Sequence, residues 1–211
     1  MGINLTFTVM DVIDIDEEEF SFDIYFSLLV KWFDKNLQFS FLKRLSAKNS
    51  VSSAVFNKIW VPDVEFNKVN LRVDSFSSQI FISRNVQPAL TGENDLLQPT
   101  EIYEGRENPF NLKIEERDKF SCSFDNIKNY PFGLQRCSLS VFIKGTDNNL
   151  TNLSPEKFLD KGPKEIGQFL IQGWRMQGKL DEITKRNIIW IELGNYHIIS
   201  PISPISIEHI L

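Results

Sequence analysis

The sequence has few of the residues on which metal sites and nucleophilic catalysis depend. It holds two histidines, His197 and His209, and two cysteines among 211 residues. No Ser/His/Asp or Cys/His order appears, so we do not expect an enzyme. The carboxylate run at residues 16–19 is typical of a solvated turn. We therefore expect neither a metal site nor another cofactor.

Surplus positive charge and long apolar runs are also lacking. The formal net charge is -5, and no basic patch is interleaved with aromatic residues, which argues against a nucleic-acid partner. No apolar run reaches the length needed to span a bilayer. The chain enters a strand-like pattern at Ile3 without a signal-peptide core, so the signal of a secreted form has been removed or lies outside this sequence.

What the sequence does contain is aromatic residues in alternating patterns. Phe occurs 18 times against 3 Met, which suits flat sheet packing. Apolar and polar residues alternate with period two over residues 4–9, 20–27, 110–115, 139–143 and 188–191. We predict an all-β fold, an immunoglobulin-like β-sandwich of two sheets and about ten strands.

The predicted domain covers residues 1–195, and an irregular tail covers residues 196–211. Pro201 and Pro204 prevent a regular helix in this tail. The one helical signal lies at residues 154–158, where Ser154 can act as N-cap and Pro155 can begin a single turn.

The two cysteines enclose a short segment. Fourteen residues separate Cys122 from Cys137, and a bond between them would stabilise the fold by roughly 3 kcal/mol through loop closure. Such a bond would indicate an oxidising compartment. Three glycosylation acceptors of the form Asn-x-Ser/Thr fit a secretory route, and they are Asn4, Asn149 and Asn152.

Four short segments follow one another in a particular order. They are the acidic segment 11–19, which contains Asp16 and Glu17; Trp32-Phe33-Asp34-Lys35-Asn36-Leu37; Trp60-Val61-Pro62-Asp63; and Tyr130-Pro131-Phe132 followed by Gln135 and Cys137. Together they resemble the extracellular ligand-binding domain of the Cys-loop (pentameric ligand-gated) ion channels. The resemblance runs from Ile3 to about Gly194.

The resemblance implies a disulfide between Cys122 and Cys137 and a coupling surface formed by its loop and segment 11–19. The coupling residues would be Tyr130, Pro131, Phe132, Asp16 and Glu17. The residues implied as structural anchors are Trp32, Asp34, Trp60, Pro62 and Asp63. Without the resemblance, the cysteines suit a stapled loop in any secreted β-domain, and residues 60–63 suit a buried corner in any β-sandwich.

The sequence departs from the family where a transmitter cation would bind. Lys144 stands at the second-loop position that the family fills with an aromatic residue, and Ser27 replaces the aromatic residue five positions before Trp32. The third loop, residues 177–186, contains no Tyr. A quaternary ammonium ligand held by aromatic faces is therefore not expected. Lysines and an arginine permit an anionic or zwitterionic ligand, or none.

Six residues are candidates for ligand contact. They are Phe66, Tyr103, Lys144, Trp174, Lys179 and Arg186. The second predicted strand and residues 102–106 would supply the facing side of the site. The alternatives are solvated surface for the cationic residues and core packing for Trp174.

The function that the resemblance implies is ligand recognition in a channel subunit. Identical or homologous subunits would form a pentamer, bind a small molecule at their interfaces and act on a pore domain that this sequence does not contain. The site would lie outside the plasma membrane. The alternatives are a secreted pentameric binding protein of the same fold, and a scaffold subunit or adhesion-type β-sandwich without a small ligand.

Overall fold

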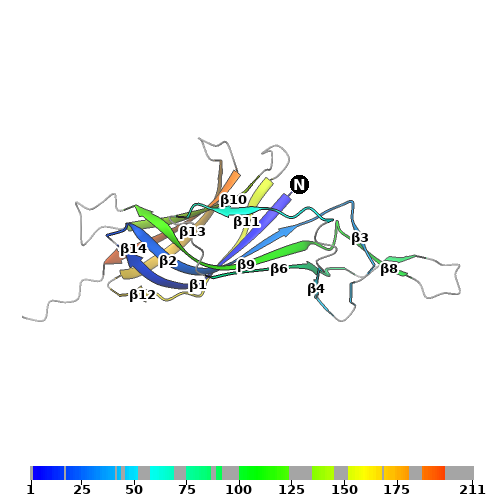
Figure 1. The fold of residues 1–211 in the computed structure, drawn as a ribbon, viewed down its shortest axis with the longest axis horizontal. Helices are drawn as coiled ribbons and strands as arrows, with labels where there is room; N and C mark the ends of the chain where they lie inside the picture. The colour runs from blue at the N-terminus through cyan, green and yellow to red at the C-terminus, as the bar shows by residue number, and fades with distance from the viewer. Residues whose placement is uncertain are drawn as a thin grey trace, which may run out of the picture.

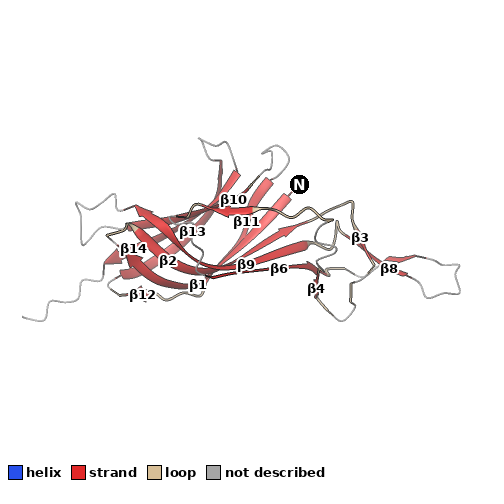
Figure 2. Cartoon of the chain, in the orientation of Figure 1, coloured by secondary structure: helices blue, strands red, loops and turns tan. Residues whose placement is uncertain are grey.

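A computed structural model describes the greater part of the chain, and all regular secondary structure in that part is β-strand (Figure 2). The described residues are 2–16, 18–40, 42–43, 46–51, 58–68, 75–86, 89–91, 100–123, 135–144, 152–167, 169–180 and 187–197. The predicted all-β class is confirmed. No helix of the described part has the length and apolarity that a membrane crossing requires.

Fourteen strands are described, more than the ten expected, because several span only two or three residues. The strands are β1 (Gly2–Asp16), β2 (Ser21–Trp32), β3 (Gln38–Phe39), β4 (Lys48–Ser50), β5 (Val64–Phe66), β6 (Ser75–Ser83), β7 (Ala89–Thr91), β8 (Thr100–Glu104), β9 (Phe110–Ser123), β10 (Gln135–Ile143), β11 (Asn152–Asp160), β12 (Glu165–Ile166), β13 (Phe169–Leu180) and β14 (Asn187–His197). Alternation over two residues is too short to be recognised in a sequence.

Eleven strands form one curled sheet, in which two layers enclose the core (Figure 1). The order is β11-β1-β2-β9-β10-β14-β13-β12, with β6 beside β9, β4 beside β6 and β5 beside β10. The layer of β1, β2, β6 and β9 joins the layer of β10, β13 and β14 through two residue pairs of β9 and β10 and through an isolated bridge between Lys68, which follows β5, and Phe120. A small sheet, β3-β8-β7, extends at one end.

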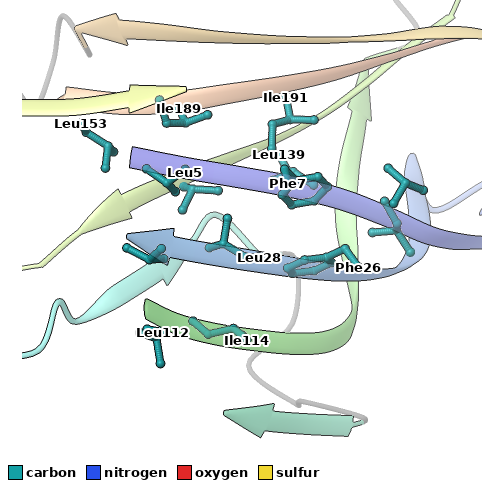
Figure 3. Packing of buried hydrophobic residues seen from close by; sticks show 14 of the residues in the cluster. Leu5, Phe7, Phe26, Leu28, Leu112, Ile114, Leu139, Leu153, Ile189 and Ile191 are labelled. Atoms are coloured by element: carbon teal, nitrogen blue, oxygen red, sulfur yellow. The ribbon is translucent and has the colours of Figure 1, made fainter. Parts of the chain in front are cut away.

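The core lies between these layers and explains the alternating sequence patterns. Ile3, Leu5, Phe7 and Val9 of β1 are fully buried, whereas the residues between them are half-buried. Figure 3 shows Leu5 and Phe7 of β1 close to Leu139, Ile189 and Ile191 of the other layer, and the buried side chains of β2 and β9 belong to the same cluster. Each large apolar side chain buried in this way stabilises the fold by about 1.5–3 kcal/mol.

The helical turn predicted at residues 154–158 is wrong, because this segment lies within β11. β11 pairs in parallel with β1, and the register shifts so that Leu5 faces Pro155 while Thr6 faces Lys157. Among the described strands β11 pairs only with β1, and a proline is tolerated at a bulge on an edge strand. Pairing with β1 therefore overrides the local capping signal.

The last strand extends beyond the predicted domain boundary at residue 195. β14 continues to His197, which lies opposite Phe169 of β13. Tyr196 and His197, assigned above to the irregular tail, are therefore in a strand. Residues 198–211 lie outside the described part of the chain.

Gly105 holds the small sheet against the turn that follows β2. Its N–H donates to the carbonyl oxygen of Leu37 at 2.9 Å, and a Cβ at residue 105 would lie 2.3 Å from the carbonyl oxygen of Asp34. Asp34 itself accepts a hydrogen bond from the N–H of Asn36 at 3.0 Å. The turn of residues 34–37 is thus in backbone contact with the end of β8.

We expect Gly105→Ala to lower the free energy of unfolding by about 1–3 kcal/mol, because its methyl group would displace backbone rather than a movable side chain. Urea unfolding monitored by tryptophan fluorescence measures the change. Gly173→Ala is the control, since a Cβ there meets nothing within 4 Å. Equal stability of the two variants would contradict the close approach.

Candidate functional site

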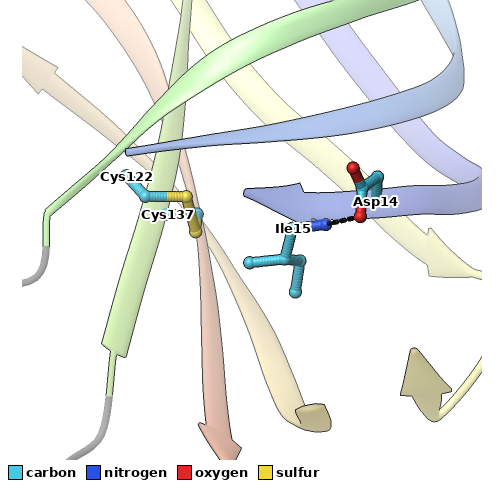
Figure 4. The surroundings of a disulfide bond; sticks show 4 residues. All are labelled: Asp14, Ile15, Cys122 and Cys137. Atoms are coloured by element: carbon cyan, nitrogen blue, oxygen red, sulfur yellow. Dashed lines mark hydrogen bonds between the residues drawn. A yellow bond between two sulfur atoms is a disulfide. The ribbon is translucent and has the colours of Figure 1, made fainter. Parts of the chain in front are cut away.

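The predicted disulfide is present and lies where the two layers meet. Cys122 of β9 and Cys137 of β10 are opposite each other in the strand register, and their sulfur atoms are bonded (Figure 4). Both side chains are buried in the core cluster. The bond therefore fixes the closest approach of β9 to β10 and of one layer to the other.

The turn between β1 and β2 is attached to the disulfide. Phe20 ends this turn with a φ of 51°, and its carbonyl oxygen accepts a 2.7 Å hydrogen bond from the N–H of Cys122. The carboxylate of Asp16 accepts hydrogen bonds from the N–H groups of Glu18 and Glu19, at 3.0 and 2.9 Å. The Phe20 side chain is 48% exposed. This arrangement presents an aromatic side chain to solvent beside the disulfide.

Two further polar contacts lie close to this turn. Asp14 accepts a hydrogen bond from the N–H of Ile15 at 2.9 Å (Figure 4). Glu19 pairs with Lys119 at 2.8 Å, and this hydrogen bond raises the pKa of Lys119. The other predicted coupling residues, Glu17, Tyr130, Pro131 and Phe132, lie outside the described residues.

The tryptophans of the second and third motifs pack against each other. Trp32 is 1% exposed and stacks on Phe110 at 5.5 Å, whereas Trp60 is 41% exposed and meets Trp32 edge-on at 6.2 Å. Pro62 is buried, and the carbonyl oxygen of the exposed Asp63 accepts a 2.8 Å hydrogen bond from the N–H of Lys144. The motif thus connects the core around Trp32 to the end of β10.

The three aromatic ligand candidates do not come together on one surface. The ring of Phe66 points into the core, 5.2 Å from the ring of Phe26. Tyr103 is buried in β8, and its hydroxyl group donates to Glu101 at 3.1 Å. Trp174 is half-buried against Phe158, with ring centroids 5.7 Å apart.

The two described lysine candidates do share a surface. Glu65, Phe142, Ile188 and Lys179 lie side by side across β5, β10, β14 and β13, on the side away from the core. Lys144, just beyond β10, pairs with Glu65 at 2.8 Å. We call this surface, formed by Glu65, Phe142, Lys144, Lys179 and Trp190, the lysine face. Arg186 lies outside the described residues.

Trp190 is the residue of this face that the sequence analysis did not single out. It alternates with the core residues Ile189 and Ile191, so its side chain projects to the outer side of β14. The Lys179 ammonium lies 4.6 Å from the centroid of its ring. A large aromatic residue at an outward position of a strand is the sequence signal by which it could have been found. The face of the Trp190 ring, to which a cationic ligand would bind, is already occupied by the Lys179 ammonium.

A cavity of about 370 Å³ opens on the outer side of the other layer. Its lining includes Thr6, Thr8 and Met10 of β1, Ser27 and Leu29 of β2, Phe81 of β6, Lys113 and Glu115 of β9, together with Lys48, Leu159 and Lys161. We call it the outer pocket. The lining includes Ser27 and Leu29 of the second strand, and none of residues 102–106.

A buried ionic cluster lies inside the sandwich and was not anticipated. Lys68, which follows β5, pairs with Asp118 at 2.7 Å and also with Glu116. Both carboxylates project from β9 into the core layer and are at most 3% exposed. Glu116 and Asp118 continue the alternate buried positions of Leu112 and Ile114 along β9. This alternation is the sequence signal from which their burial could have been predicted.

The pKa directions in this cluster follow from burial and pairing. Burial raises the pKa of Glu116, although Lys68 opposes the shift. Burial would lower the pKa of Lys68, but its hydrogen bonds to Asp118 and Glu116 raise that pKa above its ordinary value. Because Lys68 follows β5 and the acids lie on β9, the cluster joins the two layers.

The glycosylation candidates lie in different surroundings. Asn152 is exposed at the first position of β11, and Asn4 is half-buried in β1 between β2 and β11. Asn149 lies outside the described residues.

Comparison with known proteins bears on the identity of the first part of the chain. No curated protein matches the sequence. Residues 1–92 match the family model described as neurotransmitter-gated ion-channel ligand binding domain. The match includes both tryptophan motifs and the segment that contains Asp16, and the family is one of ligand-binding domains rather than enzymes. The resemblance to the Cys-loop channels is thereby confirmed over residues 1–92, which are similar in sequence to the ligand-binding domain of neurotransmitter-gated ion channels.

Proposed function

We propose that this chain is the ligand-recognition domain of a pentameric ligand-gated ion channel subunit on the outer side of the plasma membrane. It binds a small molecule between subunits and transmits binding to a pore through the disulfide end. The observation that carries this proposal is the pair of surfaces on opposite sides of one core. The lysine face lies outside β10, β13 and β14, and the outer pocket lies outside β1, β2 and β9.

Two different surfaces on opposite sides of a molecule suit a ring of identical subunits. In a head-to-tail contact each chain places one surface against the other surface of its neighbour, and the ring closes if the rotation allows it. The lysine face of one chain then covers the outer pocket of the next, and a ligand in the pocket touches both subunits.

The transmission step uses the contacts around the disulfide. β10 carries one edge of the lysine face and also Cys137, while Cys122 holds the carbonyl oxygen of Phe20. A shift of β10 on ligand binding would move both cysteines together and displace the Phe20 turn. The exposed Phe20 ring would be the group that reports this movement to a neighbouring domain.

Covalent cross-linking tests the proposed ring. We expect the double variant Lys113→Cys/Lys179→Cys, treated with a short bismaleimide, to form chains of linked subunits that stop at five. Lys113 lines the outer pocket and Lys179 lies on the lysine face, so a link between them within an assembly joins neighbours. Denaturing gels and mass photometry of the native protein measure the number of subunits.

Each single-cysteine variant is the control and should give no product larger than a linked pair. A native mass of one subunit, or a ladder that continues past five, would contradict the closed ring.

A further inference from the structure

We infer that the outer pocket binds a small anionic amphiphile, a carboxylate on an apolar body. The inference rests on the proposed function for placing the ligand in this pocket, and it adds the chemical class of that ligand. Ligand pockets of a few hundred cubic ångströms commonly combine an apolar lining with a few polar groups that fix orientation. A volume of about 370 Å³ is at the small end of that range.

The charge of the lining favours an anion. Lys48, Lys113 and Lys161 are opposed by one carboxylate, Glu115. Glu115 pairs with Lys113, which leaves Lys48 and Lys161. Neither of these two forms an ion pair with any other described residue. Two lysine charges near a partly enclosed cavity attract a carboxylate and repel an ammonium group.

The aromatic residue of the pocket does not offer its face to a cationic ligand. Phe81 is 5% exposed and lines the pocket, and the Lys48 ammonium lies 5.2 Å from the centroid of its ring. The position at which a ligand cation would contact the ring is therefore occupied by a cation of the protein itself. Ser27, also in the lining, adds a hydroxyl group and no further ring.

The remaining lining distinguishes an amphiphile from an inorganic anion. Met10, Leu29 and Leu159 present half-buried apolar side chains to the cavity. A small inorganic anion would leave this surface in contact with water, whereas an alkyl or aryl group would cover it. The carboxylate would then lie toward Lys48 and Lys161, and the apolar body toward these three side chains.

Methionine methyl NMR with three matched probes tests this assignment on the full chain. Octanoate, octan-1-ol and octylamine share one alkyl chain and differ in head-group charge. Met10 lines the pocket, and Met176 packs against the core on β13, so labelled methionine provides a reporter and a control within one sample. We expect octanoate to shift the Met10 signal saturably and to leave that of Met176 unchanged.

The lysines are tested by neutral replacement. Lys48→Gln and Lys161→Gln should each weaken octanoate binding about tenfold, the loss typical of one charge-assisted contact. Lys31→Gln is the matched control, because Lys31 projects from the same side of β2, pairs with Glu156 and does not line the pocket. Comparison of octanoate with 3-phenylpropanoate distinguishes a fatty-acid source from an aromatic acid.

Three results would overturn the inference: octylamine or octanol binding as tightly as octanoate, unchanged octanoate affinity in both lysine variants, or a Met10 signal that ignores octanoate. The outcome is separable from that of the ring proposal. A monomer that binds octanoate at Met10 would refute the ring and support the ligand class, and a pentamer indifferent to octanoate would do the reverse.

Discussion

Lys68→Met is expected to lower the free energy of unfolding at neutral pH by about 3 kcal/mol. The variant leaves Glu116 and Asp118 buried without their cation, and each would keep at most 3% of its surface in water. The expected loss is at the lower end of the range for broken buried pairs because the Lys68 side chain is itself 18% exposed. Chemical denaturation with intrinsic fluorescence measures it.

A neutralised cluster provides the control for this prediction. Adding Glu116→Gln and Asp118→Asn to Lys68→Met should recover most of the lost stability, since no charge is then buried. Lys68→Arg should retain more stability than Lys68→Met, because it keeps a cation beside the carboxylates. If Lys68→Met proved as stable as the wild type, the cluster would not join the layers as described.

The same cluster predicts how stability changes with pH. The pKa of Glu116 is raised in the folded protein, so the folded state holds more protons than the unfolded state above the ordinary carboxyl range. The contribution of Glu116 to the free energy of unfolding therefore decreases as the pH rises from its unfolded-state pKa through its folded-state pKa. The raised pKa of Lys68 adds a contribution that persists to alkaline pH and is lost only as pH passes through its folded value.

Glu116→Gln should accordingly flatten the pH dependence of stability above the ordinary glutamate pKa of about 4.3, where the raised pKa of Glu116 acts. Thermal unfolding across this range, with the wild type beside the variant, measures the two slopes. A wild-type stability that rises more steeply with pH than that of the variant would contradict the direction assigned to Glu116.

Removing the disulfide, as Cys122→Ala/Cys137→Ala, is expected to cost about 3 kcal/mol, the loop-closure value for a bond of sequence separation 15. Both cysteines lie in the core cluster, so the two alanines also leave a small packing defect. The loss should be largest in unfolding experiments under non-reducing conditions, in which only the wild type keeps the bond.

The local effect of this change is as informative as the global one. Cys122 donates its N–H to the carbonyl oxygen of Phe20, so hydrogen exchange at the amide of residue 122 reports on attachment of the β1–β2 turn. We expect that amide to exchange faster in the double variant, while amides near Trp32 at the other end of β2 follow the global stability. Unchanged protection at residue 122 would mean that the turn is held without the disulfide.

The buried side of a single strand could be predicted from the alternation of apolar and polar residues. Contacts that depend on the register between two strands could not. The pattern Leu5, Phe7, Val9 indicated which side of β1 is buried, and the structure places all three in the core. The capping signal at Ser154 failed because the partner strand β1 lies far away in the sequence. Local propensity is overridden where tertiary pairing is available.

The candidate site shows the same division. Lys144 and Lys179 were identified by position in the sequence, but their meeting with Trp190 depends on the pairing of β10 with β14 and of β14 with β13. Phe66 was expected near the ligand because it follows the Trp60 motif, and the antiparallel pairing of β5 with β10 instead directs its ring toward Phe26. The ion pairs of Lys68 with Glu116 and Asp118 likewise could not be predicted, because they depend on how β9 is placed relative to the segment after β5.

The parallel pairing of β1 with β11 has a consequence for synthesis. Ile3 is synthesised about 150 residues before its neighbour Leu153, so this pair can form only after most of the domain has been made. Until then the edge of β1 that pairs with β11 is unpaired, and the apolar side of β1 is not covered by the layer that contains Ile191. Distant pairings of this kind slow folding and prolong the exposure of apolar surface, which raises the tendency of the chain to aggregate during synthesis.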